Sequence, residues 1–286
     1  MINFIKYTKV YFIISIIFLS IGIFSMIKNG FIFGIDFTGG SIVEYKLTKN
    51  VNETNLKNKL KLSSIEIISI NKTNDKIFSI RTSPINEDQE GELRKKIKDV
   101  FSTNVEILRF DSVGPALGRE TVNKTFIASL VALAGILIYI SFTFKKFSYG
   151  IAAVFATVHD FLILLGMYSL MTLFFSAEVD SLFITAVLTT MSFSVHDTIV
   201  VFDKIRDYKK TSALSIDILS NKALTETMVR SINNSLTIIL MLIPLVVLGT
   251  ESIRFFAAAL LVGTITGTYS SPFIAVPLLV IFEKKK

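Results

Sequence analysis

The sequence predicts an α-helical membrane protein with six transmembrane helices and one small α+β domain outside the membrane. Of its 286 residues 51% are hydrophobic, and the mean hydropathy is +0.59. The apolar residues are concentrated in runs close to the roughly 20 residues that cross a bilayer. The one long polar stretch lies between the first two runs. This distribution excludes a soluble enzyme with a large core.

Six hydrophobic runs are long enough to be transmembrane helices. They are residues 11–27, 125–144, 151–175, 182–202, 231–248 and 255–282. The first run follows Lys6 and Lys9, as in a signal peptide, but residues 25–28 offer no small-x-small cleavage site. We therefore expect the first run to remain as a membrane anchor.

Basic residues in the short loops gather on one side of the predicted spans. That side holds Lys6, Lys9, Lys145, Lys146, Lys204, Arg206, Lys209, Lys210, Lys222, Lys284, Lys285 and Lys286, and the other holds Arg254. Positively charged loops stay in the cytoplasm, so we expect both termini there and the polar stretch outside. The net charge of +7 is explained by this topology and not by binding to nucleic acid.

The chain is predicted to have three parts. Residues 1–28 form a cytoplasmic tail and the first span, residues 29–122 form the extracytoplasmic domain, and residues 123–286 form spans two to six. The last part includes a polar cytoplasmic segment, residues 203–230, whose apolar residues follow helical spacing. They are Leu214, Ile218, Leu219 and Ala223. This pattern predicts an amphipathic interfacial helix.

The outer domain is predicted to alternate strands and helices. Alternating apolar residues indicate strands at 34–47, 65–70, 77–82 and 105–110, with a polar turn at 74–75. Gly39 and Gly40 permit a bend or bulge in the first strand. Helices are predicted at 53–62 and 87–101, the second with apolar residues along one face. The resulting order, β-α-β-β-α-β, is that of a ferredoxin-like split fold. That fold hosts many functions, so function has to be argued from other residues.

Two aspartates inside hydrophobic runs are the candidate functional residues of the membrane part. The chain has two histidines, and each directly precedes an aspartate inside a hydrophobic run: His159–Asp160 and His196–Asp197. A charge within a span costs roughly 2.5–3.5 kcal/mol, so such residues are usually functional. Arg230 begins the fifth span at the same cytoplasmic side as Asp197. An antiparallel helix pair would bring the two together, either as a proton carrier with a movable partner or as a static ion pair.

The neighbouring polar residues leave alternatives open. His196 and Asp197 point about 100° apart on a helix and need not act together, although histidine can relay protons. His159–Asp160 is explained either by a relay or, more simply, by a polar contact between helices. Asp36 is explained by a turn. Gly263 and Gly267 have the small-xxx-small spacing of closely packed helices.

Several chemistries are not expected. The chain has no cysteine, and neither aspartate-bearing span has two metal ligands at i and i+4, so we predict no disulfide, metal or cofactor. No phosphate-binding loop or nucleophile triad is present, so we predict that the protein is not an enzyme. The energy for any work must then come from an ion gradient or from a partner.

Four sequence blocks resemble the SecF proteins of the SecD/SecF family, within the resistance-nodulation-division superfamily. They are residues 33–40 with Asp36, Gly39 and Gly40, residues 113–120 with Gly114, Pro115 and Gly118, residues 195–206 with Asp197, and residues 224–233 with Arg230. The resemblance implies a proton pathway through Asp197 and Arg230 beside a SecD-like, six-span subunit. It also implies an outer domain that contacts emerging polypeptide. His196 stands where the family usually has asparagine.

The function that this resemblance implies is that of an accessory subunit of the Sec protein-export machinery. With a SecD-like partner it would use the proton gradient, or another ion gradient, to promote export of polypeptides through a SecYEG-type channel across the bacterial cytoplasmic membrane. Two alternatives are a half-transporter that exports lipid, drug or metal, and a scaffold of the export channel that transports nothing. Six spans with one outer domain make half of a full superfamily transporter, which predicts a partner.

Overall fold

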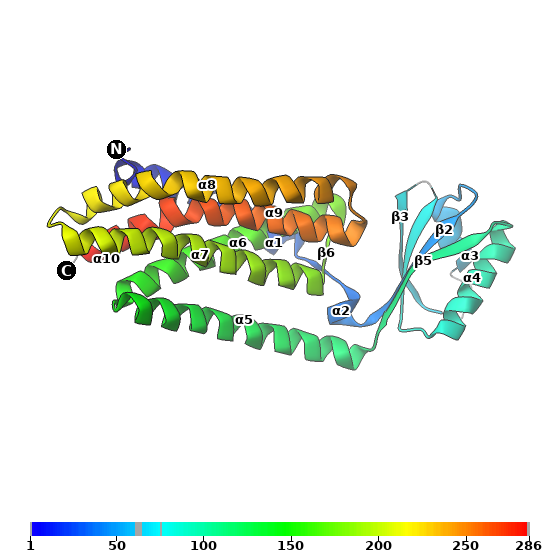
Figure 1. Cartoon of the computed structure of the whole chain (residues 1–286). Helices are drawn as coiled ribbons and strands as arrows, with labels where there is room; N and C mark the ends of the chain where they lie inside the picture. The colour runs from blue at the N-terminus through cyan, green and yellow to red at the C-terminus, as the bar shows by residue number, and fades with distance from the viewer. Residues whose placement is uncertain (1, 61–64, 75, 285–286) are drawn as a thin grey trace. The chain divides into compact units, whose positions relative to one another are not determined.

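A computed structural model describes residues 2–60, 65–74 and 76–284, and it contains two compact units (Figure 1). One unit comprises Met1–Ile32 and Ile127–Lys286, and the other comprises Phe33–Phe126. Each unit is described by itself below. The first holds most of the length of the long helices, and the second holds the four-stranded sheet.

Six helices in the described part of the chain are long and apolar enough to cross a membrane, which confirms the six predicted spans. They are Ile5–Asn29, Glu120–Phe144, Phe147–Phe175, Ser181–Thr211, Ile216–Leu248 and Glu251–Lys284. The protein is therefore a multi-pass membrane protein. The corresponding helices are α1 (Thr8–Asn29), α5 (Pro115–Phe144), α6 (Phe147–Phe175), α7 (Ser181–Thr211), α8 (Ile216–Leu248) and α9 (Glu251–Ser270). A π-helical turn, η2 (Ser271–Ala275), joins α9 to α10 (Val276–Lys284) in the last span.

The polar segment 203–230 is not a separate amphipathic helix. Helix α7 continues to Thr211 and α8 begins at Ile216, so the segment consists of the ends of two spanning helices. Of the four apolar residues named in the prediction, Leu219 and Ala223 are buried, whereas Leu214, which lies between the two helices, and Ile218 are 53% and 39% exposed. Tertiary packing between α8 and the rest of the unit explains the two buried positions.

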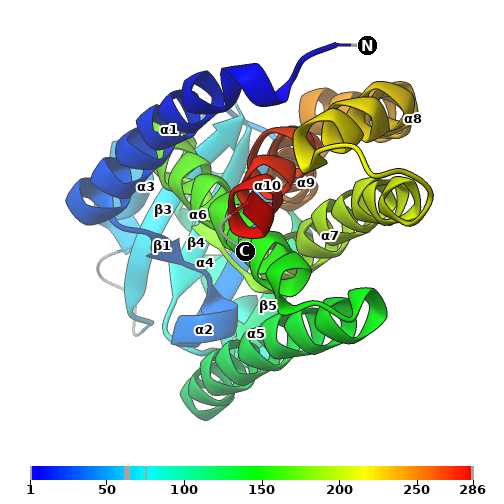
Figure 2. The same cartoon turned by 90° about the vertical axis from the view of Figure 1, so that its left-hand side faces the viewer.

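Helix α9 lies at the centre of the helical unit. It packs against α6, α7 and α8, and Figure 2 views these helices nearly end on. Small residues line much of its buried surface, namely Ala257, Ala258, Ala259, Gly263, Thr264, Gly267 and Ser270. Small side chains let helix backbones approach closely where lipid supplies no hydrophobic driving force.

A second close approach joins α1 and α6. A Cβ atom added at Gly166 would lie 2.4 Å from the Cα of Gly22, and one added at Gly22 would lie 2.9 Å from the Cα of Gly166. Nearby, the hydroxyls of Ser25 and Ser169 share a hydrogen bond of 2.9 Å. Because backbone faces backbone at the glycines, no side chain can rotate away to make room.

The Phe33–Phe126 unit is built on an antiparallel sheet. Its strands are β2 (Gly40–Leu47), β3 (Ile67–Asn74), β4 (Ile77–Thr82) and β5 (Val105–Val113), and their order in the sheet is β3-β4-β2-β5. Helix α3 (Glu53–Leu60) follows β2, and α4 (Glu87–Phe101) follows β4. The elements therefore occur along the chain in the predicted order. Residues 61 and 62 of the first predicted helix and Asp75 of the predicted turn lie outside the described residues.

The core of this unit lies between the sheet and its two helices (Figure 1). Alternate residues of the central strands are buried, as period-two patterns require. The core includes Val43, Tyr45, Phe78 and Ile80 from the strands and Leu56, Leu60, Leu93 and Ile97 from the helices. The Tyr45 hydroxyl also donates a 2.8 Å hydrogen bond to Oε1 of Glu90 on α4, and burial raises the pKa of Tyr45 well above its ordinary value.

The predicted strand from Gly34 to Leu47 is wrong in its first half. Residues Ile35–Thr38 form a short helix, α2, and the strand begins at Gly40. Gly39 and Gly40 have φ angles of 73° and 118°, which other residues rarely adopt. The two glycines therefore turn the chain from α2 into β2, at the position where the sequence predicts a bend or bulge.

We predict that Gly166→Ala destabilises the helical unit by roughly 1–3 kcal/mol, the range for overpacking a tight interior. The added methyl would meet the backbone of α1. Gly135→Ala on α5 is the matched control, because a Cβ there meets nothing within 4 Å. Thermal unfolding of the purified variants measures the effect. Equal melting temperatures for the two variants would contradict the proposed backbone contact.

Candidate functional site

Both predicted aspartates lie inside the helical unit. The side chains of Asp160 on α6 and Asp197 on α7 are buried, each residue being 5% exposed. A carboxylate at such a position needs hydrogen bonds or an opposite charge. The two aspartates meet this need in different ways, which separates their chemistry.

Asp197 is partly satisfied and lines a cavity. The Ser231 hydroxyl of α8 donates a 2.5 Å hydrogen bond to its Oδ1. Its Oδ2 is buried and has no hydrogen-bond partner in the described part of the chain. The cavity beside it has a volume of about 710 Å³ and is lined by residues of α7 and α8. These include His196, Asp197, Glu226, Arg230, Asn233 and Asn234.

Arg230 reaches the same cavity as Asp197, as the antiparallel arrangement predicted. Among the salt bridges of the described residues none joins these two side chains, and Arg230 is exposed at the surface of the chain. His196 is also exposed and lines this cavity. Although consecutive side chains on a helix point about 100° apart, His196 and Asp197 both line this cavity.

Asp160 is fully hydrogen-bonded. The hydroxyls of Ser194 on α7 and Ser270 on α9 each donate to its Oδ2 at 2.5 Å, and Nδ1 of His159 lies 3.0 Å from its Oδ1. One carboxylate thus connects three helices. The sequence did not reveal the two serines as site residues. A signal existed, since Ser194 lies three residues before Asp197 and the pair Ser270–Ser271 directly precedes Pro272.

The break in the last span places these serines. Regular α-helix ends at Ser270, and the π-helical turn η2 follows with Pro272 in it. Proline has no N–H to donate, and π-helical turns frequently occur at functional sites. The Ser271 hydroxyl shares a 2.8 Å hydrogen bond with Thr198 of α7 and donates to the carbonyl of Ser194 at 3.3 Å. Two consecutive hydroxyls therefore connect α9 and η2 with both neighbouring helices.

Gly263 and Gly267 bring α9 against α7 at this level. A Cβ added at Gly267 would lie 3.0 Å from the Cβ of Ser194, and one added at Gly263 would lie 2.3 Å from Cγ2 of Thr190. These contacts agree with the predicted small-xxx-small packing. They also explain how a short serine side chain on α7 reaches the carboxylate of Asp160.

The glycine motifs of the Phe33–Phe126 unit contact each other. A Cβ added at Gly39 would lie 2.8 Å from the Cα of Pro115, and one added at Gly118 would lie 2.8 Å from the carbonyl oxygen of Phe37. Residues 33–40 therefore pack against the first turns of α5. Asp36 lies in the first turn of α2, and a Cβ at Gly114 would meet nothing within 4 Å.

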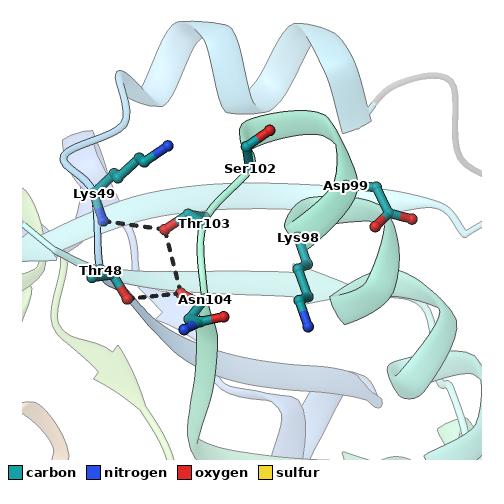
Figure 3. Close-up of a pocket in the computed structure, with 7 residues that line it drawn as sticks. All are labelled: Thr48, Lys49, Lys98, Asp99, Ser102, Thr103 and Asn104. Carbon is teal, nitrogen blue, oxygen red and sulfur yellow. Dashed lines mark hydrogen bonds between the residues drawn. The ribbon is translucent and has the colours of Figure 1, made fainter.

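A cavity of about 620 Å³ also lies in the Phe33–Phe126 unit, at the end of α4 (Figure 3). The backbone N–H of Lys49 donates to the Thr103 hydroxyl at 3.1 Å, and the Thr48 hydroxyl donates to the carbonyl of Asn104. The Thr103 hydroxyl also donates to the carbonyl of Asn104 at 3.4 Å, so the hydrogen bonds drawn in Figure 3 join Thr48, Lys49, Thr103 and Asn104.

In the described part of the chain, no three His, Cys, Asp or Glu side chains come together in a way that would hold a metal ion. Asp197 and Asp160 are titratable side chains, and serine hydroxyls hydrogen-bond to both.

The sequence matches two described protein families. Residues 92–285 match the family described as protein export membrane protein SecD/SecF, C-terminal, and residues 24–51 match the SecD/SecF GG motif. The chain is 36% identical to the protein translocase subunit SecF of Thermobaculum terrenum, covering 100% of this chain and 95% of that protein. It is 35% identical to the corresponding subunit of Anaerolinea thermophila, with coverage of 99% and 94%.

Two solved structures resemble the chain. The crystal structure of SecDF from Thermus thermophilus, a translocon-associated membrane protein, superposes with a TM-score of 0.85 at 30% identity. The structure of SecDF in its super-membrane-facing form gives a TM-score of 0.69 at 28% identity. Each match covers at least 99% of this chain but 39% of the SecDF chain. This chain thus corresponds to about two-fifths of SecDF.

The absence of cysteine makes cavity access directly testable. We predict that Asn234→Cys, at an exposed position in the α7–α8 cavity, reacts rapidly with a water-soluble thiol reagent in the detergent-purified chain. Thr264→Cys, at a buried position on α9, should react far more slowly because reagents need an accessible thiolate. Mass spectrometry measures both rates. A rate for Asn234→Cys as slow as that for Thr264→Cys would show that the cavity is closed.

Proposed function

This chain belongs to the SecD/SecF family of protein-export membrane proteins, and we propose that it acts as an accessory subunit of the Sec translocation machinery. In this proposal an ion gradient, in the first place a proton gradient, drives the subunit to promote export of polypeptides. The observation that carries the proposal is the buried Asp197 carboxylate with one oxygen unpartnered beside a cavity that Arg230 also lines. The family and the near-complete match to SecF proteins support it.

A SecD-like subunit is the proposed partner. The exposed face of α7 and α8 carries His196, Arg230, Asn233 and Asn234 at the cavity. Polar groups in a span seek other helices or water and avoid lipid. A second set of helices against this face would enclose the cavity and supply partners for these groups. The match to two-fifths of SecDF supports this pairing.

The proposed proton carrier is Asp197, with Arg230 as its movable counterion. Arg230 keeps its charge at all relevant pH values, whereas the aspartate can be charged or neutral. When the guanidinium approaches, the carboxylate is favoured; when it withdraws, protonation removes an uncompensated buried charge. Ser231 orients the carboxyl through Oδ1 and leaves Oδ2 available for the proton. His196 is proposed as an additional proton acceptor in the cavity.

The Phe33–Phe126 unit is proposed to be a ferredoxin-like domain on the outer side of the bacterial cytoplasmic membrane, with both chain termini in the cytoplasm. The strand order β3-β4-β2-β5, with a helix after β2 and another after β4, supports the ferredoxin-like assignment. The distribution of Lys and Arg supports the orientation. We propose that this domain contacts the polypeptide leaving a SecYEG-type channel, and that the protein makes and breaks no covalent bonds.

We predict that Asp197→Asn, assembled with the SecD-like partner, abolishes the gradient-dependent part of precursor translocation. The amide has nearly the same shape but cannot carry the proton. Translocation into inverted membrane vesicles, measured with and without an ionophore that collapses the gradient, gives this part as a difference. Asp207→Asn is the control, because Asp207 is exposed near the end of α7 and pairs with Lys210.

A scaffold that transports nothing leads to the opposite outcome. The Asp197→Asn variant would then assemble and support export with its gradient dependence unchanged. Co-purification of each variant with the partner shows whether assembly is intact, so a folding defect is distinguished from a lost proton site.

A further inference from the structure

We propose that His159 and Asp160 form a second protonation site, and that uptake of one proton there weakens the hydrogen bonds holding α7 to α6 and α9. This inference deepens the proposed function and rests on it for the source of the proton. The pair lies outside the Asp197 cavity, yet one of its hydrogen-bond donors, Ser194, is three residues from Asp197 on the same helix.

The geometry around Asp160 is that of a carboxylate built to hold a charge. Its Oδ2 accepts from Ser194 and Ser270 at 2.5 Å, and both hydroxyls are buried, at 1% and 0% exposure. Its Oδ1 faces Nδ1 of His159 at 3.0 Å. Hydrogen bonds to an ionised acceptor are roughly twice as strong as those between neutral groups. The ionised form therefore holds α6, α7 and α9 together through one carboxylate.

The second ring nitrogen of His159 supplies an entry point for a proton. His159 is 7% exposed, and its Nε2 is buried without a hydrogen-bond partner in the described part of the chain. A buried polar atom of this kind is costly unless water or another group reaches it. If Nδ1 carries the hydrogen and donates to Asp160, then Nε2 is a free lone pair, ready to accept a proton.

The proton balance follows from these positions. The pair begins with neutral His159, protonated at Nδ1, and charged Asp160, with a total charge of −1. A hydrated proton binds Nε2, and the Nδ1 proton then moves to Oδ1 of Asp160, because a buried imidazolium–carboxylate ion pair is costlier to desolvate than two neutral groups. The pair ends as histidine protonated at Nε2 and a neutral carboxylic acid, with a total charge of zero. Oδ2 is now a carbonyl oxygen and a weaker acceptor for Ser194 and Ser270.

The weakened hydrogen bond from Ser194 to Asp160 lies on α7 close to Asp197. Ser194 and Asp197 lie three residues apart, so they are neighbours on adjacent turns. Both serine hydroxyls keep a hydrogen bond to the carbonyl oxygen, but these bonds are weaker than those to the charged carboxylate. Ser271 keeps its hydrogen bonds to the Ser194 carbonyl and to Thr198, so the contact between α7 and the last span loosens without opening completely.

The other titratable groups near the pair are few. Helices α1, α7, α9 and α10 and the turn η2 pack against α6. The Tyr269 ring of α9 lies 6.3 Å from the His159 ring, and its hydroxyl donates to the carbonyl of Tyr11 on α1. Helix α7 brings His196 and Asp197, which line the cavity. The turn η2 has no titratable side chain, and the remaining charged residues of α1 and α10 lie toward the helix ends: Lys9, Lys28, Glu283 and Lys284.

Infrared difference spectroscopy of the complex with the SecD-like partner tests the proposal. Spectra recorded at low minus high pH should contain one carbonyl-stretch band of a protonated carboxyl that disappears in Asp160→Asn and persists in Asp197→Asn. Thr157→Val is the matched control, because that buried hydroxyl on α6 bonds to the carbonyl of Ala153 in its own helix. The control should keep the band. A spectrum of Asp160→Asn with every carboxyl band intact would overturn the proposal.

Two further variants keep the test decisive if Asp160→Asn fails to assemble. Ser270→Ala removes one hydrogen bond to the carbonyl oxygen and should shift the same band to higher frequency; an unshifted band overturns the assignment. His159→Gln removes the entry point and should abolish the band within the same pH range. Coupling is read from the Asp197 band, whose pH midpoint should differ between wild type and Ser194→Ala. An identical midpoint contradicts the coupling.

These results are distinguishable from failure of the proposed function. If the band disappears in Asp160→Asn while gradient-dependent export is normal in Asp197→Asn, the second protonation site stands and the proton-carrier role of Asp197 is rejected. Full loss of gradient-dependent export in Asp197→Asn, with no band from Asp160, would do the reverse.

Discussion

A carboxylate inside the hydrocarbon layer is stable when hydrogen bonds or an opposite charge compensate its loss of water. The helical unit contains two such carboxylates and compensates them differently. Asp160 accepts from two serines on other helices and faces the adjacent histidine, whereas Asp197 accepts from one serine and keeps an oxygen unpartnered beside a cavity. The first arrangement fixes three helices relative to one another. The second leaves room for a charge to change.

The other features of this unit follow from the need to bring short hydroxyl side chains to a carboxylate. Serine reaches an acceptor on a neighbouring helix only if the two backbones are close, and glycines at 263 and 267 provide that closeness on α9. The break after Ser270 supplies hydroxyls to both neighbours of the last span. The central position of α9 brings it into contact with α6, α7 and α8, which also contact one another through α7 (Figure 2).

The sequence predicts the elements of this protein well, because their signals are local. Run length identified the six spans. Period-two alternation placed the strand Ile77–Thr82, and apolar residues at helical spacing placed the helix Glu87–Phe101, both at their observed bounds. Local patterns failed where the outcome depended on distant residues. The residues before Gly39 form a short helix and not a strand where the motif packs on Pro115, and burial against other helices accounts for only Leu219 and Ala223 of the apolar pattern in segment 203–230.

The charged residues of the candidate site were predictable from the sequence, but their hydrogen-bond partners were not. Charged residues stand out in apolar runs, so Asp160, Asp197 and Arg230 were evident from the sequence. Ser194, Ser231 and Ser270 were not, because serine is common in membrane helices and gains meaning only from the helix it faces. The shared cavity of His196 and Asp197 also depended on how α7 and α8 pack, which helical periodicity alone does not determine.

Helices α7 and α8 are longer than a membrane requires. With 31 and 33 residues they extend about 46 and 50 Å at 1.5 Å per residue, against a hydrocarbon thickness of about 30 Å. Part of each helix therefore extends beyond the length that the membrane requires, and a salt bridge between Lys204 of α7 and Glu226 of α8 joins the two helices. If proton uptake at Asp197 rotates either helix, as the proposed function implies, the displacement is larger at the helix ends, which lie farther from the carboxylate than its immediate neighbours do.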